Sequence, residues 1–92
     1  MERIKVGDLC VSVKGRDKGR VFLVVNVTEN RAQIVDGKKR KVLSPKTKNI
    51  KHLVGIEGSG LIDTANKILR GEPTGNGRVY GEINAQIKKR EE

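Results

Sequence analysis

The sequence contains very few aromatic residues, one cysteine and one histidine. Among its 92 residues there are one Phe, one Tyr, one Cys, one His and no Trp. A single cysteine cannot form a disulfide within the chain or build a cysteine-based zinc site, so we expect a reducing compartment and a packing role for Cys10. No acidic residues are paired at a catalytic spacing, and no triad or metal cage can be assembled. We therefore expect no enzyme and no cofactor.

Long apolar runs are also missing. No run approaches the roughly 20 residues that a membrane-spanning helix needs, and the first residues lack the apolar segment of a signal peptide. With so few aromatic residues the core must be built from Val, Ile and Leu, which favours a small barrel or sandwich. A length of 92 residues allows one small domain, or a small domain with an appendage. We expect a cytoplasmic protein with no membrane partner.

Positive charge is abundant, and it is concentrated in the first part of the chain. The formal net charge is +9 and the pI is about 10.1. Residues 1–55 contain fourteen Lys or Arg and five Asp or Glu, whereas residues 56–92 contain six of each kind. The whole excess of positive charge therefore lies in residues 1–55, which points to a polyanionic partner.

A basic segment at residues 14–20 separates two apolar segments, and we expect it to form the tip of a β-hairpin. It reads Lys-Gly-Arg-Asp-Lys-Gly-Arg. Glycine adopts the positive φ angles that tight turns need, so Gly15 and Gly19 are expected to have them. Asp17 is expected to pair with a cation beside it in the sequence, to cap the turn, or to be an ordinary turn residue.

Apolar residues predict five short strands in the first part of the chain, which suggests a mainly β fold, a small five-stranded SH3-like barrel. The second strand is apolar at nearly every position, as is typical of a central strand, and the C-terminal part is expected to cover Phe22 and Val24. Asp36-Gly37 is a strong hairpin signal, so a fourth strand is expected directly after it. Pro45 interrupts the pattern, and a basic loop is expected at residues 44–49. The predicted strands are residues 9–14, 21–27, 31–35, 38–43 and 50–56.

Residues 57–92 are expected to form a helical C-terminal extension of a barrel made by residues 1–56. Apolar residues at helical spacing predict a helix at residues 61–70, with Ser59 as its N-cap and Gly71 after its end. Residues 74–77 are expected to form a flexible linker. A weaker second helix follows, and both fraying in solution and docking at a fixed site are open for it.

The segment from Gly7 to Val25 resembles a KOW motif. In this family an apolar strand enters a glycine-containing basic turn, and a second apolar strand leaves it. The continuation Asp36-Gly37-Lys38-Lys39-Arg40-Lys41, then Pro45-Lys46-Thr47-Lys48 and Lys51-His52-Leu53, is similar to large-subunit ribosomal proteins of archaea and eukaryotes and to related small bacterial KOW-domain proteins. The resemblance covers residues 7–53. It implies an SH3-like barrel that binds structured RNA, usually ribosomal RNA, through its loops.

The resemblance also implies which residues contact RNA. They form two basic groups, which make a single site if the barrel brings them to one side. For His52, a contact with RNA and a place in the core or at a strand edge are both open. The implied residues are Lys14, Gly15, Arg16, Lys18, Gly19 and Arg20 in the first group, and Lys38, Lys39, Arg40, Lys41, Lys46, Lys48, Lys51 and His52 in the second.

We therefore expect a non-catalytic, ribosome-associated protein that binds structured RNA, in the first place large-subunit ribosomal RNA. A neighbouring ribosomal protein or a translation factor is a further expected partner, through the C-terminal helix. Phe22 belongs to an expected strand and Tyr80 to the neutral C-terminal part, so we expect recognition of RNA shape and backbone without stacking on bases. The competing hypothesis is a protein-interaction module of the transcription or translation machinery.

Overall fold

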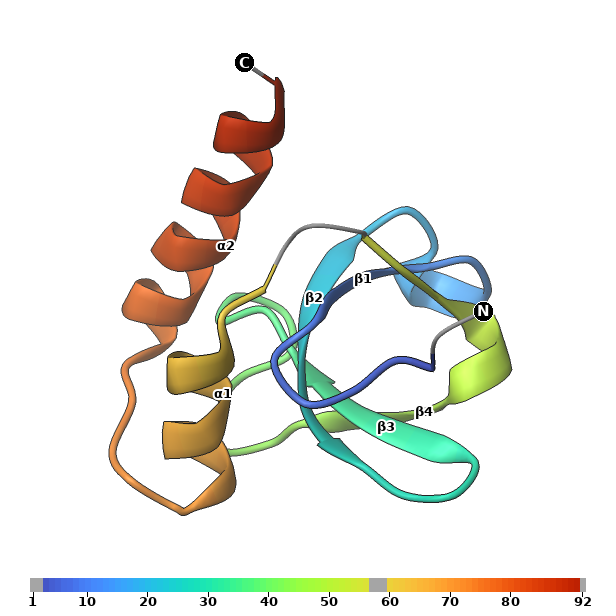
Figure 1. Cartoon of the computed structure of the whole chain (residues 1–92), viewed down its shortest axis with the longest axis horizontal. Helices are drawn as coiled ribbons and strands as arrows, with labels where there is room; N and C mark the ends of the chain where they lie inside the picture. Colours follow the sequence, from blue (N-terminus) through green and yellow to red (C-terminus); the bar gives the residue numbers. More distant parts are fainter. Residues whose placement is uncertain (1–2, 57–59, 92) are drawn as a thin grey trace.

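The chain folds into an antiparallel β-sheet with two helices on one side of it (Figure 1). The computed structural model describes residues 3–56 and 60–91. The elements are β1 (Leu9–Ser12), η1 (Gly15–Asp17), β2 (Val21–Val27), β3 (Arg31–Val35), β4 (Lys46–Asn49), η2 (Ile50–His52), β5 (Leu53–Gly55), α1 (Ile62–Leu69) and α2 (Asn76–Glu91), where η marks a 3-10 turn. The five strands lie in the order β4-β3-β2-β1-β5. The expected mainly β fold with C-terminal helices is confirmed.

Strand β2 is the centre of the sheet, as its apolar sequence predicts. It pairs with β1 through Cys10 and Phe22, and with β3 through Val24 and Ile34. Four consecutive residues, Phe22 to Val25, are almost completely buried. Both faces of the strand are therefore covered, and the predicted bounds of β2 and β3 are confirmed.

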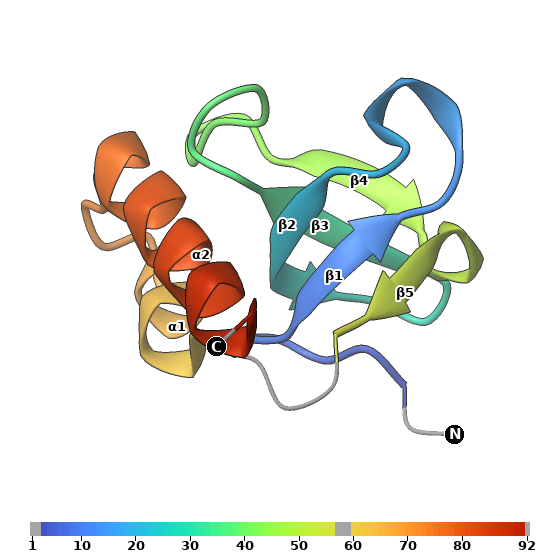
Figure 2. The same ribbon diagram turned by 90° about the horizontal axis from the view of Figure 1, so that it is seen from above.

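The helices cover the face of the sheet to which Leu23 and Val25 belong (Figure 2). On α2, Val79 is 0% and Ile83 is 3% exposed, and both belong to the same hydrophobic cluster as these strand residues. Fully burying an aliphatic side chain of this size contributes about 1.5–3 kcal/mol. Fraying in solution and docking at a fixed site were both open for the second helix, and in the structure it is docked against the sheet.

Phe22 and Val24 point to the other face, where the C-terminal part does not cover them. They pack with Cys10, Ile34 and Leu53 in a second cluster, which the curved sheet encloses itself. The expectation that the C-terminal part covers Phe22 and Val24 was wrong. The reason is the alternation along β2, which turns Leu23 and Val25, and not Phe22 and Val24, toward the helices.

The predicted strand at residues 38–43 does not form. The Asp36 carboxylate instead accepts hydrogen bonds from the backbone N–H groups of Lys38, Lys39 and Arg40, at 2.9, 2.9 and 2.8 Å. An Asx-type cap of this kind offers the backbone an alternative to a strand ladder. The fourth strand is β4, which lies in the predicted loop at residues 44–49 and directly follows Pro45.

The last predicted strand is shorter than expected. Of residues 50–56, only Leu53–Gly55 form a strand, β5, which pairs with β1 through Val54 and Val11 among others. The preceding residues form η2, because the Asn49 side chain accepts a hydrogen bond from the Lys51 N–H at 3.0 Å and bends the chain.

The first predicted helix is confirmed with slightly narrower bounds, as α1. Gly71 follows it with a φ of +79°, as expected of a helix-ending glycine. The proposed cap Ser59 lies outside the described residues. Helix α2 begins at Asn76, so the linker expected at residues 74–77 is only partly a linker. Within the described residues, neither helix is long and apolar enough to cross a membrane.

Candidate nucleic-acid interface

The first basic loop, residues 14–20, is a tight connection between β1 and β2. Gly15 and Gly19 have φ angles of +79° and +87°, so the predicted positive values are confirmed. The loop is closed by backbone hydrogen bonds from the Gly19 N–H to the Ser12 carbonyl at 2.8 Å and from the Ser12 N–H to the Arg20 carbonyl at 3.1 Å. The cationic side chains of this loop are all exposed, and they are Lys14, Arg16, Lys18 and Arg20.

The second basic loop, residues 36–45, connects β3 to β4. Its turn is held by the Asp36 carboxylate and by the Asp36 N–H, which donates to the Arg40 carbonyl at 2.9 Å. Within it Lys38, Lys39 and Lys41 are exposed. Local hydrogen bonds therefore fix the path of the backbone in this turn without a ligand.

Asp17 and Arg40 join the two basic loops. The Arg40 Nη2 and Nε atoms donate to the same carboxylate oxygen, Asp17 Oδ2, at 2.8 and 3.2 Å. Asp17 is only 1% exposed. It therefore does not pair with a cation beside it in the sequence, and it is more than an ordinary turn residue.

The charges around Asp17 set its pKa. Burial alone would raise the pKa of this carboxyl, but the hydrogen bond from Arg40 and the charges of Arg40, Lys48 and Lys39 outweigh it and lower the pKa. The other carboxylate oxygen, Oδ1, is buried without a hydrogen-bond partner among the described residues. Asp17, a residue of the first basic loop, thus stays ionised at neutral pH among cations that the second basic group supplies.

Lys48 brings β4 close to the first basic loop. Its Nζ donates to Ser12 Oγ at 2.6 Å and to the Lys14 carbonyl at 2.7 Å. Strands β4 and β1 are separated in the sheet order by β3 and β2. One lysine side chain spans them because the sheet is strongly curved.

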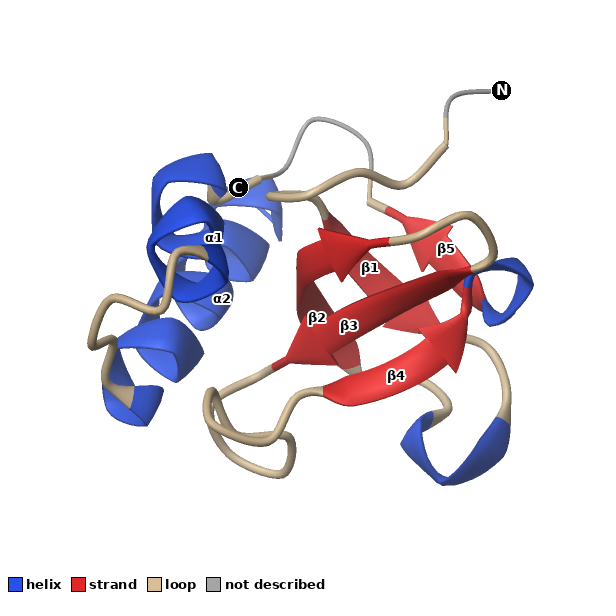
Figure 3. Cartoon of the chain, turned by 90° about the horizontal axis from the view of Figure 1, so that it is seen from below, coloured by secondary structure: helices blue, strands red, loops and turns tan. Residues whose placement is uncertain are grey.

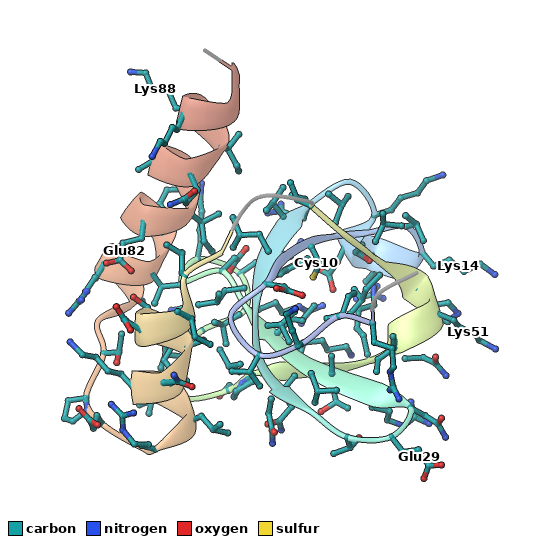
Figure 4. All side chains as sticks on the ribbon, in the orientation of Figure 1. Cys10, Lys14, Glu29, Lys51, Glu82 and Lys88 are labelled. Atoms are coloured by element: carbon teal, nitrogen blue, oxygen red, sulfur yellow. The ribbon has the colours of Figure 1, made fainter. Side chains whose placement is uncertain are left out.

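Lys51 and His52, the last two residues of η2, also lie beside the first loop. The Val13 N–H donates to the His52 carbonyl at 2.9 Å, which holds η2 beside the loop. Lys14 and Lys51 project from the same side of the molecule (Figure 4). The pKa of His52 is lowered by a slight loss of hydration and by the charges of Lys14, Lys51 and Lys48. His52 is half-buried and directly precedes β5, so it lies at a strand edge beside the lysines and not in the core.

Both basic loops project from the same side of the sheet, at the upper edge of Figure 2 and the lower edge of Figure 3. We call this side, with Lys48, Lys51 and His52, the basic face. Close contacts or mutual electrostatic effects connect eight of the predicted residues to one another or to Asp17. Apart from backbone hydrogen bonds within the first loop, from the Lys18 N–H to the Gly15 carbonyl and from the Arg20 N–H to the Asp17 carbonyl, no such interaction among the described residues connects six others to the site. These are Arg16, Lys18, Gly19, Arg20, Lys41 and Lys46, and all but Lys46 belong to the two loops. The connected residues are Lys14, Gly15, Lys39, Arg40, Lys48, Lys51, His52 and Lys38, the last only through the turn that Asp36 holds.

The charges of the basic face are largely uncompensated. Lys14, Arg16, Lys18, Arg20 and Lys51 form no salt bridge with another described residue. On the helical side, by contrast, two cations are paired with acidic residues, Arg70 with Glu72 and Arg78 with Glu82. The charge asymmetry of the sequence is thus also an asymmetry of the folded surface.

Helix α2 touches the second basic loop, which the sequence did not indicate. The Val42 N–H donates to the Asn76 side-chain oxygen at 2.8 Å. A Cβ atom on Gly37 would lie only 2.1 Å from the Asn76 carbonyl oxygen, and the Lys38 Nζ lies 5.4 Å from the centre of the Tyr80 ring. The start of α2 therefore supports the loop, and Tyr80 stands at the edge of the basic face.

Cys10 occupies the interior of the curved sheet (Figure 4). It is 0% exposed, and burial raises the pKa of its thiol to about 12, with a smaller contribution from the charge of Asp8. The thiol is therefore protonated at neutral pH, and the expected packing position is confirmed. Among residues 3–56 and 60–91, no three His, Cys, Asp or Glu side chains are grouped as a metal ion would require.

Comparison with models of known protein families found none that matches this chain. The resemblance to KOW domains therefore depends on the residues quoted from positions 7–53. The contacts between the two basic loops depend only on the geometry described above, so they stand independently of any family.

Proposed function

We propose that this protein binds structured RNA without catalysis, in the first place ribosomal RNA of the large subunit, as a ribosomal or ribosome-associated protein. One observation carries the proposal: the Asp17–Arg40 contact joins two basic loops that are far apart in the sequence into one face. A face with many uncompensated cations and few acids is complementary to closely spaced phosphates.

The proposal includes a small SH3-like barrel of the KOW type. The strand order and the curvature that lets Lys48 reach Ser12 support this interpretation. In such an architecture the strands form a rigid scaffold, and the loops at one end make the contacts. Rigid loops lose less conformational entropy when they bind, which favours a ligand of fixed shape such as folded RNA.

Phosphate binding of this kind has a quantitative signature. Each cation that contacts a phosphate contributes a slope of about −0.7 to −0.9 to a plot of log affinity against log salt. If about six to eight cations of the basic face make such contacts, the total slope is about −4 to −7. Between 50 and 200 mM salt the affinity would then fall by about 10²- to 10⁴-fold.

The first experiment compares two variants with equal loss of charge. Arg16→Ala with Lys18→Ala removes two exposed cations from the basic face, whereas Lys88→Ala with Lys89→Ala removes two exposed cations from the far end of α2 (Figure 4). Binding to ribosomal RNA fragments is measured by fluorescence anisotropy over a range of salt. We expect the first pair to reduce the steepness of the slope by about 1.4–1.8 and the second to leave it unchanged. Equal changes of slope in the two double variants would mean that RNA binds to a generally basic surface and not specifically to the basic face.

A second experiment tests the ribosomal assignment. Cell extract is sedimented through sucrose gradients at low and at high salt, and the protein is detected in each fraction. We expect it in large-subunit fractions at low salt and at the top of the gradient at high salt. Absence from ribosomal fractions at low salt would refute the assignment. Unchanged RNA affinity in the Arg16 and Lys18 variant, together with lost binding to a protein, would favour the protein-interaction module.

A further inference from the structure

Tyr80 provides an aromatic surface at the edge of the basic face, although sequence reasoning placed it in a neutral tail. It is the only tyrosine of the chain, and 40% of its surface is exposed. The Lys38 ammonium lies 5.4 Å from the centre of its ring. An aromatic ring beside cations is the combination that nucleic-acid-binding surfaces use to hold an unpaired base and its phosphate.

The backbone that carries the Tyr80 ring is held in place by its surroundings. The neighbouring residue Val79 is completely buried under the sheet. The backbone of Gly37 packs against α2 so closely that an added Cβ atom would lie 2.9 Å from the Tyr80 backbone nitrogen. Asn76, one turn earlier, accepts the hydrogen bond from the Val42 N–H. The start of α2 and the second basic loop are therefore held against each other, which keeps the Tyr80 ring beside Lys38, as a stacking surface requires.

We propose that Tyr80 stacks on an unpaired base of the bound RNA, while Lys38 and its neighbours in the second basic loop contact the adjacent phosphates. This inference rests on the proposed function, and it narrows the ligand to an RNA helix interrupted by an unpaired nucleotide. Bases within an uninterrupted helix are stacked on one another and cannot reach a side chain at the edge of the protein. An unpaired base can turn outward onto the ring, and its own phosphate then lies beside the Lys38 ammonium.

The test uses the intact protein and three short RNA hairpins. One carries a single bulged adenosine, the second carries an abasic nucleotide at the same place, and the third is fully paired. The chain contains no tryptophan, so its fluorescence comes from Tyr80 alone. We expect quenching of this emission by the bulged hairpin and markedly less by the other two, since the abasic hairpin has the same phosphates but no base to stack.

Variants of Tyr80 provide a second, independent measurement. A base stacked on an aromatic ring typically strengthens binding by about 5- to 100-fold. Tyr80→Ala and Tyr80→Leu should lose this preference for the bulged hairpin over the abasic one, and Tyr80→Phe should keep it. All variants should bind the fully paired hairpin as the unmodified protein does, and circular dichroism checks that α2 remains folded.

The outcomes separate this inference from the proposed function. Salt-dependent binding that is equal for all three hairpins, with equal changes in tyrosine emission, would overturn the stacking and leave the phosphate-binding face intact. Absence of salt-dependent binding to every hairpin and to ribosomal RNA fragments would overturn the proposed function itself. A preference for the bulged hairpin that Tyr80→Leu retains would also refute stacking, because leucine offers an apolar surface without an aromatic ring.

Discussion

The contact between Asp17 and Arg40 predicts an asymmetric response to mutation. The Asp17 side chain is 2% exposed, whereas the Arg40 side chain is 25% exposed. Arg40→Ala leaves a buried carboxylate without its partner, a change that typically costs about 3–5 kcal/mol. Protonation limits this cost at pH 7 to about 4 kcal/mol, which is the free energy needed to protonate a carboxyl of pKa about 3.9. The free energy of unfolding should therefore fall by about 3–4 kcal/mol.

Asp17→Ala should be milder, because the Arg40 guanidinium can turn toward water. The loss of hydrogen bonds to a charged group then costs about 1.5–3 kcal/mol. The double variant should resemble Asp17→Ala, since no buried charge remains in it. Adding Asp17→Ala to Arg40→Ala is thus expected to restore about 1 kcal/mol of stability. Urea unfolding at pH 7, followed by circular dichroism, measures all four proteins.

The pH dependence provides the control. In the unmodified protein the pKa of Asp17 is lowered, so its contribution to stability is present above the unfolded pKa and is lost as the pH falls through the folded pKa. In Arg40→Ala the unpartnered carboxyl should have a raised pKa, and its penalty should shrink on acidification. The stability difference between these two proteins should therefore narrow from pH 7 to pH 4. A double variant that is less stable than Arg40→Ala, or a difference that widens, would refute the reasoning.

Three other predictions follow from single residues. Gly37→Ala should cost about 3 kcal/mol or more in unfolding free energy, because its Cβ would lie 2.1 Å from the Asn76 carbonyl oxygen. Gly19→Ala has a similar φ but open space around it, and it should cost about 1–2 kcal/mol. Equal losses in the two variants would contradict the contact between Gly37 and α2. RNA affinity should rise from pH 7 to pH 6, because bound phosphates favour protonated His52, and an unchanged pH profile in His52→Gln would exclude this role. Cys10 should react with a thiol reagent only when the protein unfolds, so the labelling rate should increase with urea; rapid labelling in native buffer would contradict its burial.

The central part of the fold is predictable from the sequence, and the edges are not. Strands β2 and β3 appear with their predicted bounds because their apolar residues have one favourable solution, a position in the middle of the sheet. Strand β4 contains Lys, Thr, Lys and Asn and no apolar residue. An edge strand with no buried side chain leaves no periodic signal. Its pairing with β3 depends on the backbone alone.

The candidate site shows the same division between local and distant information. Residue type and spacing identify the cations and the two glycines with positive φ, because these properties are local. The partner of Asp17 comes from 23 positions further along the chain, and a sequence offers no means of choosing Arg40 over the neighbouring cations. The place of Tyr80 beside Lys38 is likewise a result of how α2 docks.

The second basic loop shows that a run of four cations is not four equivalent phosphate contacts. Arg40 is held by Asp17 and Lys38 lies over the Tyr80 ring, whereas Lys39 and Lys41 are exposed and form neither a salt bridge nor a ring contact with another described residue. The internal contacts use part of the positive charge to fix the loop on two sides, through the first loop and through α2. The remaining charges are then displayed in a defined arrangement. For a ligand whose phosphates are themselves held in place by folding, a fixed arrangement of fewer cations binds with less loss of entropy than a mobile run of four.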